Sequence, residues 1–299
     1  MPAIADAAAR PAQSPLARAW RIVRRDPFAT VGILIYIVFV FVAVFADQLA
    51  THDPTKILFQ PNSRRLAASL PPQPNFLLGT TNLGRDIYSQ LVYGARSALI
   101  VGVTASALVV VIGTLVGLIS GYFRGLTDML LMRVADIALG IPFMPFIIVL
   151  SGFLRPSMWN IVMGMGLLVW PSTARVIRSQ VLSLRERTFV EAARVTGSSP
   201  LRILFVHIAP NVLPLSFVYG SIAIGWAILT KASISFLGFG DSELVSWGSM
   251  LQQAYASQAL SRGQYYWFVP PGLCIILVVV AGFFVSRGFE EVLFPRLRD

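Results

Sequence analysis

The sequence predicts an all-α polytopic membrane protein with six transmembrane helices. Of its 299 residues, 56% are hydrophobic and 13% are charged, whereas an ordinary soluble domain carries about 25% charged residues. Uncharged apolar runs recur along the chain, close to the length of about 20 residues that crosses a hydrocarbon core. Of the 24 basic residues, 22 are arginine, and they lie in flanks and loops. The net charge of +10 therefore indicates anionic lipid as the partner, not nucleic acid.

The first predicted transmembrane helix occupies residues 28–50, because residues 28–46 are uncharged and long enough to cross. Residues 1–27 form a predicted cytoplasmic N-terminal tail rich in Ala, Pro and Arg. A cleaved signal peptide is the alternative, since Val44-Phe45-Ala46 loosely fits a cleavage site. The run exceeds the usual signal core of about 7–15 residues, which favours a retained helix.

Residues 51–96 contain five prolines and predict an irregular loop region on the extracytoplasmic side. The second span follows between Arg96 and Arg124. Within it Gly113, Gly117 and Gly121 fall at i, i+4 and i+8 on one face, a pattern that lets helices approach closely in lipid.

The third predicted span is residues 137–154, with Pro142 and Pro145 as sources of a kink. Three charged residues precede it near the end of a span, where local pairing or contact with another subunit is expected ahead of cargo binding: Asp128, Arg133 and Asp136. The fourth span runs from residue 157 to about residue 174. The fifth covers residues 211–230 and the sixth residues 267–285, which leaves 287–299 as a C-terminal tail.

An even number of spans places both termini on one side of the membrane. That side and its loops carry sixteen of the 24 basic residues, and the opposite side carries seven. Because positive loops stay cytoplasmic, both termini and residues 183–215 are predicted to face the cytoplasm.

Residues 183–215 predict two short helices joined by a glycine turn. Apolar residues recur there at helical spacing among several arginines. Gly197 can close the first helix, because it accepts a left-handed conformation. Ser199 and Pro200 fit the N-cap and first position of the second helix.

This loop resembles the EAA loop of membrane subunits of binding-protein-dependent ABC importers. The resemblance rests on the run Glu191, Ala192 and Ala193, which is followed by Gly197 and ends at Pro210. With Pro210, the flanking His207 and Asn211 further resemble the peptide-and-nickel branch, although Ala209 stands where Leu is usual. The resemblance implies that these seven residues form the loop that docks on an ATPase subunit.

Three other segments resemble the same branch. Residues 77–99 match its signature before the second span, with Thr81 where Asp is usual. Residues 233–240 match its Ser-Phe-Leu-Gly-x-Gly element, and residues 247–251 also fit. Lys231 stands where Glu is common and Phe294 where Asp is usual.

The resemblance implies a type I ABC importer permease fold, with residues 97–286 as the transmembrane domain and residues 183–212 as its cytoplasmic coupling loop. It also implies a bacterial inner-membrane location. The implied partners are a homologous B-type permease, two ATPase subunits and an extracytoplasmic substrate-binding protein. Homodimeric pairing remains an alternative. ATP and Mg would be used by the ATPase subunits. Peptides are the first expectation for cargo, and nickel or another small solute is the alternative.

The sequence offers little basis for an enzyme. Both lysines, Lys56 and Lys231, follow Thr, so neither fits a phosphate-binding loop, which needs Gly-Lys. His52 and His207 are expected on opposite sides of the membrane, which argues against a paired metal or catalytic site. An ion-coupled secondary transporter would need carboxylates in mid-span, and these stretches are uncharged.

Overall fold

The computed structural model describes residues 26–60, 64–154, 156–241 and 244–293, and within these ranges the chain is helical with no strand. The helices are α2 Pro27–Val44, α3 Ala46–Leu49, α4 Ile87–Phe123, α5 Gly125–Gly140, α6 Phe143–Phe153, α7 Met158–Leu168, α8 Trp170–Leu184, α9 Thr188–Val195, α10 Pro200–Arg202, the π-helix η1 Ile203–Ile208, α11 Ala209–Phe236, α12 Trp247–Ala256 and α13 Tyr265–Leu293. The predicted all-α class is confirmed. The predicted N-terminal tail lies almost entirely outside the described residues, as does Phe294.

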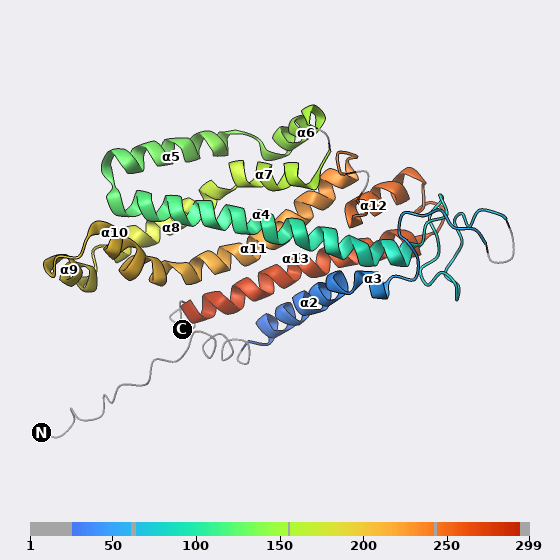
Figure 1. The fold of residues 1–299 in the computed structure, drawn as a ribbon, viewed down its shortest axis with the longest axis horizontal. Coiled ribbons are helices and arrows are strands. Elements are labelled where there is room, and N and C mark those ends of the chain that lie inside the picture. The colour runs from blue at the N-terminus through green and yellow to red at the C-terminus, as the bar shows by residue number, and fades with distance from the viewer. Residues whose placement is uncertain (1–25, 61–63, 155, 242–243, 294–299) are drawn as a thin grey trace, which may run out of the picture.

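The long helices form an elongated bundle (Figure 1). Helix α4 packs against α8, α11 and α2, and α13 packs against α11 and α2. One end of the bundle carries α9 and α10, and the end of α13 points toward it; we call it the α9 end. The other carries α3, α12 and residues 50–60 and 64–86; we call it the α12 end.

Five helical segments of the described chain are long and apolar enough to cross a membrane: Pro27–Val44, Ile87–Phe123, Met158–Leu184, Pro200–Phe236 and Tyr265–Phe289. The pair α5 and α6 gives a sixth if it counts as one span, although its two halves are bent by 79°. The chain is therefore a multi-pass membrane protein.

Two helices extend beyond the predicted spans, because helical structure continues past the apolar runs. Helix α4 begins at Ile87, ten residues before the predicted start, with Asp86 as its N-cap. Its first turns are held by burial, since Ile87 and Ser89 are fully covered by the surrounding chain. Toward the C-terminus, α13 continues to Leu293 and so includes residues 287–293 of the predicted tail at 287–299.

The third predicted span is not one kinked helix, as expected, but parts of two separate helices. Helix α5 follows α4 after a sharp turn at Arg124 and Gly125, both with positive φ, and ends at Gly140. Pro142 caps the start of α6. Pro145 falls in the first turn of α6, where a missing N–H breaks no helical bond. The prolines thus begin a new helix in a new direction.

The fourth and fifth predicted spans are both longer in the structure. The fourth is broken at Val169 into α7 and α8 and continues to Leu184. The fifth begins at Pro200, because α10, η1 and α11 follow one another without a gap. The second loop helix is therefore the first part of a span and not a separate element, which corrects the predicted helix pair.

The glycine face of α4 packs directly on α8, as the spacing predicts. A Cβ on Gly117 would lie 2.6 Å from the carbonyl oxygen of Ala174. A Cβ on Gly113 or on Gly121 would lie 2.9 Å from the nearest backbone oxygen of α8. These approaches leave no room for a side chain, so the three glycines set the distance between the two helices.

Candidate functional site

The loop that the sequence singles out forms the tip of the α9 end (Figure 1). Helix α9 ends in a Schellman motif. The amide of Ser198 donates to the carbonyl of Ala193 at 3.1 Å, and the amide of Gly197 donates to that of Arg194 at 3.0 Å. Gly197 has φ +80, which confirms the left-handed glycine. The Ser199 side chain then caps the next helix and Pro200 is its first residue, as predicted.

A π-helix joins the tip to α11 and ends just before a proline. Pro210 has no N–H to donate to the carbonyl one turn earlier, which disfavours regular α-helical bonding at this point. The Asn211 side-chain amide donates to the carbonyl oxygen of His207 at 2.7 Å. His207 and Asn211 thus shape the backbone where the loop enters the bundle, a role that the sequence did not reveal.

The structure divides the seven predicted loop residues by exposure. Ala193 is buried and packs with Val190 in a core cluster that includes Ile203, Leu204 and Ile208. Five of the seven are exposed at the tip and its junction, and His207 is half-buried; the five are Glu191, Ala192, Gly197, Pro210 and Asn211. Within the described chain, no hydrogen bond or ion pair involves the Glu191 carboxylate, which leaves it available to another molecule.

Large apolar side chains are also exposed at the tip. Val195 is 84% exposed and Leu201 60% exposed. Phe189, Phe205 and Val206 are each exposed by more than two fifths. Such grouping around exposed arginines marks an interaction surface more often than a free one.

Polar contacts fix the tip to the ends of α4 and α8. The Arg185 guanidinium donates to the carbonyl oxygen of Tyr122 at 2.6 Å. Arg124, in the turn after α4, pairs with Glu186 at 3.6 Å. Sequence reasoning counted Arg185 among the loop charges but could not foresee this contact, because its acceptor is a backbone atom 63 positions away.

The charged residues near α5 pair locally, as predicted. Arg178 on α8 donates two hydrogen bonds of 2.6 Å to Asp128, which also accepts a hydrogen bond from Ser120. Arg175 pairs with Asp136 at 2.7 Å. These residues border a cavity of about 510 Å³. The pairs hold α5 against α8.

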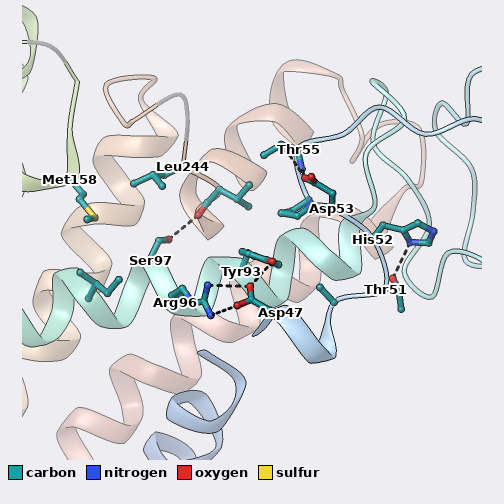
Figure 2. Close-up of a pocket in the computed structure, with 14 residues that line it drawn as sticks. Asp47, Thr51, His52, Asp53, Thr55, Tyr93, Arg96, Ser97, Met158 and Leu244 are labelled. Carbon is teal, nitrogen blue, oxygen red and sulfur yellow. Dashed lines mark hydrogen bonds and ion pairs between the residues drawn. The ribbon is translucent and has the colours of Figure 1, made fainter. Parts of the chain in front are cut away.

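The α12 end holds a larger cavity, of about 620 Å³, between α3, α4 and residues 244–245 (Figure 2). Arg96 donates to both carboxylate oxygens of Asp47 at 3.2 and 3.1 Å, and Tyr93 donates to the same carboxylate at 2.7 Å. The hydrogen bond from Tyr93, followed by that from Arg96, lowers the pKa of Asp47 below its usual value. Ser97 donates to the carbonyl of Val245 at 2.8 Å and holds the cavity's opposite wall (Figure 2).

Lys231 is the least expected residue of the bundle. It lies on α11, is 5% exposed, and its Nζ has no hydrogen-bond partner within the described residues. Its side chain borders a small void beside Trp247.

No group of three or more His, Cys, Asp or Glu residues in the described part of the chain could hold a metal ion.

Comparison with known proteins connects these features to a family. The model for the binding-protein-dependent transport system inner membrane component matches residues 113–299. The model for the N-terminal TM domain of oligopeptide transport permease C matches residues 14–72.

Two curated relatives match nearly the whole chain. The dipeptide transport system permease protein DppC of Alkalihalophilus pseudofirmus is 33% identical over 289 residues, which cover 96% of this chain and 92% of that protein. The oligopeptide transport system permease protein OppC of Bacillus subtilis is 35% identical over 280 residues, which cover 92% and 88%.

A solved structure shares the fold. A chain from the MetNI methionine ABC transporter, solved in inward facing conformations, matches with a TM-score of 0.53 and 19% identity, over 68% of this chain and 96% of that one. The likeness shows the type I ABC importer permease fold. By its family match and its relatives, the chain belongs to the inner membrane components of binding-protein-dependent transport systems.

Proposed function

We propose that this chain is a permease subunit of an ATP-driven importer of dipeptides or oligopeptides, and that residues 191–210 couple it to an ATPase. The observation that carries the coupling role is the tip itself. It combines a buried base around Ala193 with an exposed surface on which Glu191 has no partner in the described chain. The names of the two curated relatives support peptides as cargo.

The proposed assembly places this chain beside a homologous permease, above two ATPase subunits and below an extracytoplasmic binding protein in a bacterial inner membrane. The excess of arginine in the segments at the α9 end supports a cytoplasmic position for that end and for both termini. This chain would carry no catalysis of its own, and ATP and Mg would be used by the ATPase subunits.

The coupling hypothesis assigns a task to each part of the tip. Glu191 would pair with a basic group of the ATPase, and the small side chain of Ala192 would let the two surfaces approach closely. Gly197 would set the angle between α9 and the helix that begins at Pro200, whose continuation is α11. Closure of the ATPases would then move α11 directly.

The test is peptide uptake in cells that carry the complete importer. Glu191→Lys and Gly197→Pro should each reduce uptake at least about 10-fold while the protein remains in the membrane, because the docking charge or the turn is lost. Membrane abundance is measured in parallel by immunoblot. Normal uptake in both variants would refute the coupling role.

Gly197→Ala and Gly263→Ala form a matched pair of controls. Both glycines have positive φ, and a Cβ at either would meet nothing within 4 Å. The backbone strain is therefore similar, but only Gly197 lies at the tip. We expect a larger uptake defect at Gly197. Uptake that survives ATP depletion and collapses with the proton gradient would instead favour an ion-coupled transporter.

A further inference from the structure

A second cavity at the α12 end, of about 470 Å³, has a mostly polar lining. It lies among residues that precede α4, the end of α11 and the helix α12. The polar groups that border it include Arg85, Gln90, Ser235, Asp241, Ser249 and Gln253. Thr55, Leu244 and Val245 line both this cavity and the one in Figure 2, so the two spaces adjoin.

Three segments far apart in the sequence meet around this cavity. Arg85 and Gln90 come from residues 77–99, Ser235 from residues 233–240, and Ser249 from residues 247–251. All three segments carry motifs that the sequence analysis identified. The proposed coupling role does not involve any of them.

Two polar atoms at this site are buried without a protein partner in the described residues. Gln90 is 2% exposed, and its amide nitrogen donates to the carbonyl of Pro54 at 3.1 Å, but its Oε1 accepts nothing. The Nε of Arg85 is likewise buried without a partner. An unsatisfied buried polar atom costs about 1–3 kcal/mol. Donor and acceptor capacity therefore remains for a molecule that enters the cavity.

The charges of the lining have a definite arrangement. Arg85 supplies a guanidinium that can bind a carboxylate through two hydrogen bonds. Asp241 supplies a carboxylate, and the free oxygen of Gln90 adds an acceptor. The lining thus offers partners for both charges of a zwitterion, and hydroxyl and amide groups for the atoms between them.

We propose that this cavity binds a small zwitterionic peptide, with its terminal carboxylate at Arg85 and its terminal ammonium at Asp241 and Gln90. The inference rests on the proposed function, since it assigns a binding site for the peptide cargo within this chain. The volume falls within the range of about 300–1,000 Å³ that is common for small-molecule sites.

Calorimetric titration of the purified full chain in lipid nanodiscs tests the proposal with three probes. These are Ala-Ala, its C-terminal amide, and N-acetyl-Ala-Ala, so that each derivative lacks one charge. The wild-type chain should bind Ala-Ala about 10-fold more tightly than either derivative, since a hydrogen-bonded charge contributes about that factor.

Substitutions identify which group recognises which charge. Arg85→Gln should abolish the preference for the free acid over the amide and keep the preference for the free amine. Asp241→Asn should do the reverse. Arg262→Gln is the matched control at the α12 end outside this cavity's lining, and it should bind as the wild type does. Unchanged thermal unfolding of Arg85→Gln and Arg85→Lys shows that the fold is intact.

The two proposals fail in different ways. If the wild type gives no heat with Ala-Ala at millimolar concentration, or if Arg85→Gln keeps the preference for the free acid, the cavity is not this site. Dipeptide uptake by the complete importer would then still support the proposed function. If the chain binds Ala-Ala with these preferences but the complete importer takes up no peptide, the site stands and the assigned cargo fails.

Discussion

Lys231 is a buried basic side chain that lowers the stability of the folded chain. Its amine is buried among helices without a hydrogen bond from the described chain, and Asp241 provides a favourable charge interaction. Removing a charge from water costs several kcal/mol unless it is well paired. A residue of this kind lowers the free energy of unfolding.

Lys231→Met should therefore stabilise the isolated chain by about 1–3 kcal/mol, because an apolar side chain of similar length replaces a buried amine that has no hydrogen bond in the described chain. Chemical unfolding in detergent measures the difference. Lys56→Met is the control, since the Lys56 side chain is 73% exposed and its loss should change stability little. A Lys231→Met chain that unfolds more easily than the wild type would contradict the argument.

Asp47 gives a pH dependence with a definite sign. Hydrogen bonds from Tyr93 and Arg96 lower its pKa in the folded chain, so the folded state favours the ionised form. The contribution of Asp47 to the free energy of unfolding is fully present above its pKa in the unfolded chain, about 4. It is lost as the pH falls through its pKa in the folded chain. The stability difference between wild type and Asp47→Asn should be constant above about pH 5 and shrink below about pH 4. A difference that grows on acidification would refute this assignment.

At the scale of the elements, the contact between α4 and α8 depends on the absence of side chains. Gly117 lies where a Cβ would come within 2.6 Å of a backbone oxygen of α8. A backbone atom of a packed helix cannot move aside independently, so the whole helix must shift. The arginine pairs between α5 and α8 would be strained by the same shift, because they extend from the same face of the bundle.

Gly117→Ala should lower the thermal unfolding temperature and the yield of folded protein, with a cost of about 1–3 kcal/mol for overpacking. Gly272→Ala is the matched control within a long helix. A Cβ there would meet nothing within 4 Å, so the higher helix propensity of Ala should leave stability unchanged or raise it by up to about 1 kcal/mol. Equal destabilisation by both changes would show that helix packing is not the cause.

Local signals made some elements predictable and long-range packing hid others. Gly197 and Ser199 have the predicted conformation and cap because their preferences act over three or four residues. The start of α4 at Ile87 depends on burial by distant segments, so the apolar pattern misplaced it. The cavity around Gln90 and Ser235 was not predictable, because it exists only where separate spans meet.

At the scale of the whole molecule, the unbroken helical run Pro200–Phe236 is a lever. It approaches α13 closely at Ser221, whose carbonyl oxygen would lie 2.8 Å from a Cβ on Gly282, and at Gly225, where a Cβ would lie 3.3 Å from the backbone of Val279. At 1.5 Å per residue, about 38 Å of helix extends from there to the tip and about 17 Å to the far end. A rigid run that pivots at this contact would move its far end by roughly half the displacement of the tip, and in the opposite direction.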